Sequence, residues 1–345
     1  MTRRPPLRPS AVWPLAALFA ALLSSLIACG GTSSPHADIL AQGIEQPRLK
    51  VGIISVTATY VPLYLAVDDG LFAKEGLQVE LLPFRGGSDL IKAVVAGSAD
   101  VGVVSLAEVT SGIAAGQKLK AFYGGFNVPA FDWYAVPSIH TLAEAKGKRF
   151  GVTQYGSSTD FLTRYALASN GIDPAKDVQI VQGGDSPTRL AAMQAGQIDV
   201  NIFAAPDTFV AAQRGYTRIL RQKDLAPDYP YHVFGAMEPF IAGHPNTIRA
   251  LLRGFVLGLR AAKRDKPHAI EALVKRIQMD PAYAGPTYDD LIDYLFEDGR
   301  LPSEKGLDLF FEMGIKAGRF TEHWPRERYW TPSFADAYPQ WKPPE

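Results

Sequence analysis

Small hydroxyl, glycine and acidic residues gather in five short clusters, each placed just after an apolar run. The clusters are Thr57-Ala58-Thr59-Tyr60, Gly86-Gly87-Ser88-Asp89, Ser105-Leu106-Ala107-Glu108, Gly156-Ser157-Ser158-Thr159 and Gly184-Asp185-Ser186-Pro187. Turns of this kind lead into helix N-termini, whose unpaired N–H groups and partial positive charge hold anionic or polar groups. A single Ser or Thr there more often caps its own helix. The recurrence of the clusters, rather than any one residue, predicts a binding site.

The segments that carry these clusters form a repeat that occurs twice in the sequence. "AGSADVGVV" ends at Val104 and "AGQIDVNIF" ends at Phe203, 99 positions later, and Leu90 to Val101 lies opposite Arg189 to Val200. Each copy reads strand, helix, strand, helix, strand, which is typical of a parallel sheet with helices on its faces. Two unrelated βαβ units would share part of this pattern. The repeat predicts two similar α/β lobes whose turns at 57–60 and 156–159 face one ligand.

The remaining segments complete this organisation. We expect the first lobe to begin with residues 48–127, the second lobe to span 128–230, and residues 231–345 to complete the first lobe with helices. The aromatic segment 119–136 lacks helical periodicity and is interpreted as the crossing between lobes. The apolar spacing of Ile248, Leu251, Leu252, Phe255 and Leu259 predicts an amphipathic helix. The aromatic residues between 324 and 341 are expected to pack over the core rather than to bind a ligand.

The N-terminus has the pattern of an export signal. Arg3, Arg4 and Arg8 precede an apolar run, so residues 1–28 are predicted to be a signal peptide. The run ends in "LIAC", which resembles the bacterial lipobox, and this implies cleavage before Cys29 and lipid attachment to it. A plain signal peptide or an uncleaved anchor helix are the alternatives. The lipobox is favoured because Cys29 is the sole cysteine, and a free thiol would be a liability outside the cell. Residues 29–47 then form a flexible tether.

Composition narrows the class of protein. The chain has 345 residues, 47% of them apolar, which is enough to bury two cores of ordinary size. Its 35 basic and 35 acidic residues balance, so a nucleic-acid partner, which needs a basic stripe, is not expected. No pairing of the six His residues or phosphate-loop motif is visible. We therefore expect no cofactor and no metal site, and a monomer.

The chain closely resembles the substrate-binding proteins of bacterial ABC importers, in the nitrate, sulfonate, taurine and pyrimidine-precursor group. The resemblance spans roughly residues 48–320 and is carried by "KVGIISVTATYVPLYLAVDDGLFAKEGLQVEL", "GGSDLIKAVVAGSADVGVVS", "LAEAKGKRFGVTQYGSSTDF" and "GGDSPTRLAAMQAGQIDVNIFAAP". It implies a type II periplasmic-binding-protein fold, with a central cleft between two lobes joined by two crossing strands. It also implies an exported protein that closes on a small-molecule solute and docks on an ABC permease. By this resemblance binding roles fall on Thr57, Thr59, Tyr60, Ser105, Ser157, Ser158, Thr159, Ala205 and Pro206.

Further residues bear on the solute without selecting one. Arg85 follows the second strand, where it either pairs with a sulfonate or carboxylate or stays an exposed loop cation. Asp132 and Asp207 are suited to an amine. Aromatic side chains would stack on a ring, although core or hinge packing is the more common use of such residues. These aromatic candidates are Phe126, Trp133 and Tyr155. The solute is thus expected to be anionic, zwitterionic or heteroaromatic.

Two other functions compete with transport. Some proteins of this fold are enzymes, but the yeast-type pyrimidine synthase uses a cysteine-rich motif that this chain lacks. A dehydratase of the menaquinone-pathway kind would need a cytosolic location, against the export signal. An exported ligand-sensing protein, which presents its closed form to a receptor, would use the same clamp. The expectation is a binding protein, not an enzyme.

Overall fold

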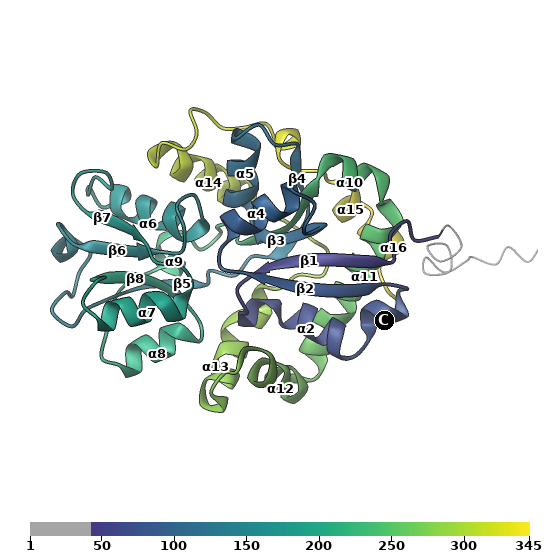
Figure 1. Ribbon diagram of the computed structural model, residues 1–345, viewed down its shortest axis with the longest axis horizontal. Coiled ribbons are helices and arrows are strands. Elements are labelled where there is room, and N and C mark those ends of the chain that lie inside the picture. The colour runs from purple at the N-terminus through teal and green to yellow at the C-terminus, as the bar shows by residue number, and fades with distance from the viewer. Residues whose placement is uncertain (1–42) are drawn as a thin grey trace, which may run out of the picture. The chain divides into compact units, whose positions relative to one another are not determined.

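The short apolar runs of the sequence form two five-stranded sheets in the computed structural model, which describes residues 43–345 (Figure 1). The first sheet has the order β2-β1-β3-β10-β4 and the second has the order β7-β6-β8-β5-β9. The strands of the first sheet are β1 (Arg48–Ile54), β2 (Gln78–Phe84), β3 (Val101–Ser105), β4 (Leu119–Phe126) and β10 (His232–Met237). Those of the second sheet are β5 (Phe131–Ala135), β6 (Arg149–Val152), β7 (Gln179–Gln182), β8 (Val200–Ala204) and β9 (Thr217–Arg221).

The two sheets have the same mixture of strand directions. In the first, β1 pairs in parallel with β2 and β3, and β10 lies antiparallel between β3 and β4. In the second, β6 pairs in parallel with β7 and β8, and β5 lies antiparallel between β8 and β9. Parallel neighbours require crossover connections, usually helical, and helices alternate with these strands along the chain. The prediction of two similar α/β units is confirmed.

The 99-residue repeat extends to element bounds and strand register. Helix α4 (Gly87–Val95) and helix α7 (Ser186–Gln194) begin and end 99 positions apart, as do β3 and β8. Val51 of β1 pairs with Val101 of β3, and their equivalents Phe150 and Val200 pair in the second sheet. The sequence similarity therefore reflects one structural unit used twice. We call the first sheet with its helices up to α5 the first lobe, and the second sheet with η2 to α9 the second lobe.

Along the chain, the helices of each lobe follow its strands. In the first lobe they are η1 (Ala58–Tyr60), α2 (Val61–Asp68), α3 (Leu71–Lys74), α4 and α5 (Leu106–Ala114). In the second lobe they are η2 (Ala143–Ala145), α6 (Ser158–Ser169), α7, α8 (Asp207–Gln213) and α9 (Gln222–Leu225). The C-terminal segment contributes α10 (Glu238–Gly243), α11 (Pro245–Arg264), α12 (Lys266–Ile277), α13 (Pro281–Leu291), η3 (Ile292–Tyr294), α14 (Glu304–Lys316), η4 (Arg326–Arg328), α15 (Ser333–Asp336) and α16 (Tyr338–Trp341).

The chain passes between the sheets twice. Strand β4 ends at Phe126 in the first sheet and β5 begins at Phe131 in the second. The return lies between the end of β9 at Arg221 and the start of β10 at His232. The lobe boundaries at 127/128 and 230/231 stay predictions, and they fall inside these two links.

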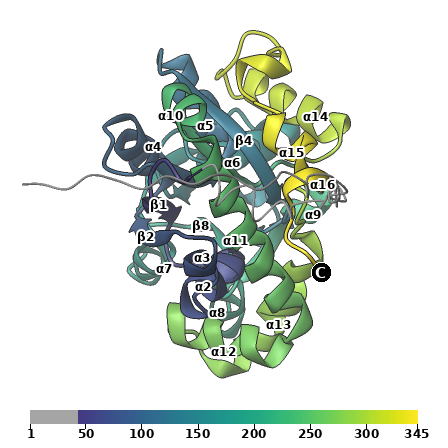
Figure 2. The same cartoon turned by 90° about the vertical axis from the view of Figure 1, so that its right-hand side faces the viewer.

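The C-terminal helices pack on both lobes. Helix α11 runs alongside α2 and α3 (Figure 2). Its apolar residues Ile248, Leu251, Leu252, Phe255 and Leu259 are buried as their spacing predicts. A Cβ at Gly258 would lie 2.0 Å from the Pro62 carbonyl oxygen, so the close approach of α11 to α2 depends on this glycine. Helix α14 instead packs on α6 of the second lobe, where the Phe310 and Phe161 rings stack with centroids 5.2 Å apart.

The aromatic tail covers the first sheet. Trp330 forms a bridge with Ala121 of β4, and the Trp341 carbonyl oxygen accepts a hydrogen bond of 2.6 Å from Arg253. All six tail aromatics are buried, as expected for tail packing: Trp324, Tyr329, Trp330, Phe334, Tyr338 and Trp341.

Candidate functional site

A cavity of about 170 Å³ lies among loops that follow the strands of the two sheets. From the first lobe it is lined by Thr57 after β1, Gly87 at the start of α4, and Glu108 in the first turn of α5. From the second lobe it is lined by residues 157–159 at the start of α6 and by Asp207 at the start of α8. Open α/β sheets bind ligands at the carboxyl ends of their strands. This cavity is therefore the candidate site.

The turn before α6 is held by its own hydroxyl groups. Ser157 is the N-cap of α6: its hydroxyl donates to the Gln154 carbonyl oxygen at 2.7 Å and accepts the Asp160 N–H at 3.5 Å. The Thr159 hydroxyl accepts the Thr153 N–H at 2.9 Å. Ser157 thus has the capping role that is usual for a single residue of its type, whereas Thr159 ties the preceding loop to the first turn of α6. The turn that results presents the backbone N–H of Ser158 to the first lobe.

Glu108 joins the two lobes at the cavity. Its side chain is buried, accepts a hydrogen bond from the Ser105 hydroxyl on Oε2, and accepts the Ser158 N–H on Oε1 at 2.9 Å. Burial raises the pKa of Glu108 to about 7, although the hydrogen bonds from Ser105 and Ser158 act in the opposite direction. Glu108 therefore exchanges its proton near neutral pH.

Other hydrogen bonds between the lobes lie beside Glu108. The Gln154 side-chain amide donates to the Asp89 carboxylate. The Ser88 hydroxyl donates to the Tyr155 carbonyl oxygen at 3.3 Å. Asp89 and Ser88 belong to the first turn of α4, which approaches the loop between β6 and α6. The loops that face the cavity are thus in direct contact on this side.

The second lobe contributes a buried guanidinium. Arg189 of α7 is 2% exposed and lines the cavity. Its Nη1 donates at 2.6 Å to both Asn201 Oδ1 and the Ile202 carbonyl oxygen, while Nε donates to the Gly184 carbonyl oxygen and Nη2 to the Ser186 hydroxyl. Burial lowers the pKa of Arg189 to about 10, a value at which the group remains charged at neutral pH.

Two carboxylates accompany Arg189. Asp185 is the N-cap of α7 and accepts the Thr188 N–H at 3.0 Å. Asp207 is partly buried, and desolvation raises its pKa, although Arg189 and the Ser186 hydroxyl act to lower it. Desolvation acts to raise the pKa of Asp185, but the hydrogen bonds from Thr188 and the positive charges of Arg85 and Arg189 together lower it.

A histidine completes the wall of the cavity. His232 at the start of β10 is 3% exposed, and its ring stacks against Tyr231 and Tyr60 with centroids 3.8 and 5.4 Å away. Burial lowers the pKa of His232 to about 3, so the ring is neutral at physiological pH. Within residues 43–345, its Nδ1 has no hydrogen-bond partner, and neither has the buried Thr57 Oγ1. Two of the lining residues therefore each contain a buried polar atom without a partner.

The structure distributes the predicted site residues over several positions. Thr57, Ser157, Ser158, Thr159 and Pro206 line the cavity. Thr59 and Ala205 line a neighbouring cavity of about 430 Å³, which also contains the Asp132–Arg218 ion pair.

The other predicted residues do not line the cavity, although Arg85 acts electrostatically on the lining residue Asp185. Tyr60 is buried in the core, where its hydroxyl bonds to the Ile54 N–H and the Val103 carbonyl oxygen. Phe126 is buried among aromatic rings. Ser105 is buried behind Glu108, while Arg85 and Tyr155 are exposed.

The principal residues that the sequence interpretation did not single out are Glu108, Arg189 and His232. The repeat offered a signal for two of them. Glu108 and Asp207 are 99 positions apart, so each lobe places one carboxylate at the same point of its fold. Arg189 is the equivalent of Leu90, a buried apolar residue of the first lobe. A charged residue at a position that is a core leucine in the other copy indicates a specialised role.

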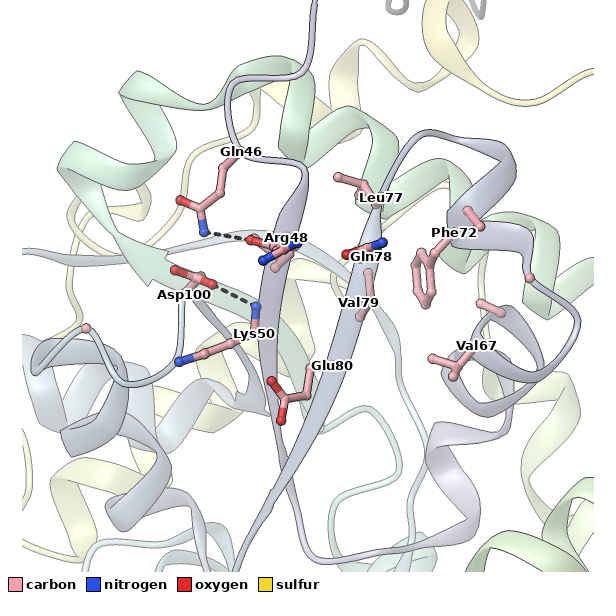
Figure 3. Close-up of a pocket in the computed structure, with 15 residues that line it drawn as sticks. Gln46, Arg48, Lys50, Val67, Phe72, Leu77, Gln78, Val79, Glu80 and Asp100 are labelled. Atoms are coloured by element: carbon pink, nitrogen blue, oxygen red, sulfur yellow. Dashed lines mark hydrogen bonds between the residues drawn. The ribbon is translucent and has the colours of Figure 1, made fainter.

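A larger cavity, of about 610 Å³, lies beside β1, β2, α2 and α3 (Figure 3). It is bordered by Arg48 and Gln78, the first residues of β1 and β2, and so lies at the opposite strand ends from the loop clusters. It contains none of the predicted site residues. We therefore do not assign the solute site to it.

Residues 43–345 contain no group of three or more His, Cys, Asp or Glu side chains placed to hold a metal. Within the same range, no helix is long and apolar enough to cross a membrane. The predicted signal peptide (1–28), the lipidation site Cys29 and most of the tether (29–47) lie outside the described residues.

Comparison with known proteins identifies a matching family model and several related binding proteins. A family model described as "NMT1/THI5 like" matches residues 57–269. The putative binding protein YtlA of Bacillus subtilis is 25% identical over 64% of this chain and 68% of its own length. The first curated relatives are aligned over 58–68% of their own length.

Solved structures show the same fold. A protein of Bordetella bronchiseptica RB50 superposes with a TM-score of 0.75 at 25% identity, over 86% of this chain and 100% of that one. The alkanesulfonate-binding protein SsuA of Xanthomonas axonopodis pv. citri superposes with a TM-score of 0.67 at 20% identity, over 79% and 95% of the two chains. The chain has the type II periplasmic-binding-protein fold, as the sequence predicted.

Proposed function

The chain belongs to the NMT1/THI5-like family, and from this premise we propose that it is the solute-binding component of an ABC transport system. It captures a small solute in the cavity of about 170 Å³ and delivers it to a membrane permease. The observation that carries the proposal is that loops of both lobes line this one cavity: Thr57 and Glu108 from the first, Ser157–Thr159 from the second.

Capture follows from the way the contacts are shared. Neither lobe alone surrounds the cavity, so only the state with both lobes together gives a solute its full set of contacts. A ligand shifts such an equilibrium by its difference in affinity for the two states. The hydrogen bond from the Ser158 N–H to Glu108 already links the lobes at the cavity wall. Solute binding would add further contacts across the same gap.

We assign solute contact to residues that line the cavity. From the predicted set these are Thr57, Ser157, Ser158, Thr159 and Pro206. To them we add Glu108, Arg189, Asp207 and His232. Ser105 acts indirectly by orienting Glu108. The relative SsuA is named for alkanesulfonates, and the solute of this chain is a small organic or inorganic molecule of anionic, zwitterionic or heteroaromatic kind.

The N-terminus fixes where capture takes place in this proposal. Residues 1–28 direct export of the chain and are then removed, and lipid on Cys29 holds the mature protein at a membrane outside the cytoplasm. The tether 29–47 then gives the binding lobes reach toward the permease. The protein acts as a monomer without a cofactor.

Binding without catalysis separates this proposal from an enzyme of the same fold. The curated relative YtlA carries the name "putative binding protein", which supports the proposal. A receptor-linked sensor would bind its solute in the same way, and the two differ in whether a permease or a receptor recognises the loaded form.

The proposal is tested by a thermal-shift screen of the purified mature protein with sulfonates, nitrate, aromatic acids, pyrimidines and small amines. We expect one solute class to raise the melting temperature in a saturable way and to be recovered chemically unchanged. Ser157→Trp should abolish this shift because the indole fills the cavity, and Thr57→Trp should do so from the other lobe. Ser138→Trp, on an exposed turn, is the matched control and should bind normally.

Three results would overturn the proposal. Turnover of the bound compound would indicate an enzyme. Normal affinity in both cavity variants, each still unfolding cooperatively, would place the site elsewhere. Absence of any binding solute would remove the basis for transport.

A further inference from the structure

A side-chain contact joins α8 of the second lobe to α13 of the C-terminal segment (Figure 1). The ring of Phe209 in α8 stacks on the ring of Tyr283 in α13, with centroids 5.7 Å apart and planes inclined by 7°. The Tyr283 hydroxyl donates to the side-chain oxygen of Gln213, one turn further along α8. We call the contact of these three residues the rim contact.

The two helices of the rim contact are fixed to different lobes. Helix α13 packs on η1 of the first lobe and on α12, and it buries Ala284 and Leu291. The hydroxyl of Tyr288, also in α13, donates to the Ala262 carbonyl oxygen of α11 at 2.9 Å. Helix α8 packs on β5 and β8 of the second lobe and buries Ala211. The rim contact therefore spans the gap between the lobes.

The repeat indicates that Phe209 has a role outside its own lobe. Its equivalent 99 positions earlier is Thr110 of α5. Thr110 is fully buried, and its hydroxyl bonds to the carbonyl oxygens of Leu106 and Ala107 in its own helix. Phe209 is only partly buried, and its ring meets Tyr283, which lies outside the repeat. The second lobe thus places an aromatic ring where the first lobe has an inward-facing hydroxyl.

The rim contact is suited to open and re-form. Where α14 packs on α6, the stacked rings of Phe161 and Phe310 are 2% and 0% exposed. By contrast, Phe209 and Tyr283 are partly buried and Gln213 is exposed. The free energy of separating apolar groups is roughly proportional to the apolar area that becomes exposed. Separation of α8 from α13 therefore costs far less than separation of α14 from α6.

The rim contact also lies next to the candidate site. Asp207, the first residue of α8, lines the cavity of about 170 Å³. Ile277, the last residue of α12, lines the same cavity, and α13 begins at Pro281 shortly after it. Movement of α8 away from α13 would therefore open the cavity on this side.

Charges on the neighbouring cavity favour the approach of the same parts of the chain. This cavity, of about 430 Å³, has basic residues on its second-lobe side and acidic residues on its C-terminal side: Arg218, Arg221 and Lys223, and Asp289, Asp290 and Asp293. Opposite charges attract over about 10 Å at moderate ionic strength. The attraction acts in the same direction as the rim contact.

We propose that the rim contact holds the lobes closed on the α8 side of the cavity even when no solute is bound. This inference rests on the lobe closure of the proposed function and names residues that set its resting balance. An offset aromatic pair stabilises an interface beyond its buried area, and the Tyr283 hydrogen bond adds to this. Because the closed state is populated beforehand, less of the solute's binding free energy is needed for closure.

Distance measurement by pulsed electron paramagnetic resonance tests the inference without any solute. Nitroxide labels are attached through Gln194→Cys in α7 and Lys275→Cys in α12, two exposed positions, in the Cys29→Ser protein, which has no other thiol. The protein is refolded from denaturant to remove bound solute. We expect a main short-distance population. Tyr283→Ala and Phe209→Ala should each lower the ratio of short to long distances about 5- to 10-fold.

Two further variants separate the rim contact from a general loss of packing. Tyr283→Phe keeps the ring and removes the hydroxyl, so it should retain most of the short-distance population. Phe240→Ala is the matched control. The Phe240 ring is also partly buried and stacks on His244 at 4.3 Å between centroids, but both residues belong to the C-terminal segment. Its loss should leave the distances unchanged.

Each outcome decides the inference. A main long-distance population in the labelled protein without further changes would overturn it, and this measurement needs no variant. The same distribution in this protein, Tyr283→Ala and Phe209→Ala would overturn it too. Because the two alanine variants lie on different lobes, one remains informative if the other folds poorly. Unchanged distances leave the proposed transport function standing, whereas failure of the solute screen leaves the distance result standing.

Discussion

At the scale of single residues, Glu108 carries the most consequence. Its side chain is buried and accepts hydrogen bonds from Ser105 in its own lobe and from Ser158 in the other lobe. It also lines the cavity, so one side chain contributes to the core, to the contact between the lobes and to the candidate site. Its pKa of about 7 lies above the ordinary value of about 4.5, because burial disfavours the charged form. Burial shifts the pKa of His232, beside the cavity, in the opposite direction: it lowers this pKa to about 3, so the ring stays neutral in mild acid.

The raised pKa of Glu108 predicts a pH-dependent stability. Between about pH 4.5 and 7 the folded protein holds a proton that the unfolded chain releases, so this group's contribution to stability falls as pH rises. The Glu108→Gln variant has no titrating group at this position, so its stability does not fall with pH for this reason. We therefore expect the stability of Glu108→Gln relative to the wild type to increase by about 2 kcal/mol between about pH 5 and 7.5.

Urea unfolding of both proteins at the two pH values measures this difference. His232 acts with the opposite sign, since the unfolded chain gains a proton below about pH 6.5 while the folded protein does not. That contribution is common to both proteins and cancels in the comparison. A difference that stays constant with pH would show that the Glu108 carboxyl titrates normally.

At the scale of elements, the start of α4 determines how closely the lobes approach. Gly87, the first residue of α4, lies against Glu108: a Cβ there would be 2.4 Å from the Glu108 Cδ. Glu108 in turn holds the Ser158 N–H at the start of α6. The N-termini of α4, α5 and α6 therefore lie close together, and the missing side chain of residue 87 leaves the space for Glu108.

Gly87→Ala should displace the Glu108 carboxylate and break its bond to Ser158. We expect a destabilisation of about 2 kcal/mol from overpacking and the lost hydrogen bond, seen as a lower urea midpoint. Gly243→Ala in α10 is the matched control, because a Cβ there meets nothing within 4 Å, and it should be neutral or slightly stabilising. An unchanged midpoint for Gly87→Ala would contradict the close packing of α4 on Glu108.

At the scale of the whole molecule, the chain consists of two similar α/β units and a C-terminal helical segment that packs on both. The two sheets share strand order and register, and the chain crosses between the lobes at residues 127–130 and 226–231. Helices α11 and α14 pack on α2 and α6, so the C-terminal segment contacts both units. The N-terminal Cys29 adds a proposed membrane anchor to this assembly.

Cys29→Ser should release the exported protein from the membrane, because the proposed lipid is the anchor and a single Ser cannot carry it through a thioether. Cell fractionation with immunodetection measures the distribution, and Ser33→Ala, a comparable small change in the tether, should stay membrane-bound. Retention in the membrane fraction of a Cys29→Ser protein that has lost residues 1–28, judged by its mass, would refute lipid anchoring.

The sequence by itself determined the architecture. Apolar runs, turn residues and the 99-residue repeat are local patterns, and they were sufficient to predict two similar α/β lobes, the aromatic crossing and the buried stripe of α11. They also predicted the turn clusters, and five of the residues named for binding line the cavity. Strand and turn formation depend mainly on neighbouring residues, so a single sequence records them.

Tertiary structure alone decided which polar groups are spent inside the protein and which remain for a solute. Tyr60 and Phe126 are buried in the core, whereas Glu108 and Arg189 line the cavity. The hydrogen bond between Glu108 and Ser158 joins residues 50 positions apart, and that between Arg189 and Asn201 joins residues 12 positions apart. Burial and pairing are set by what folding brings near, and hydrogen bonds and charges act only over short distances. The chemistry of the site therefore exists only once both lobes are in place.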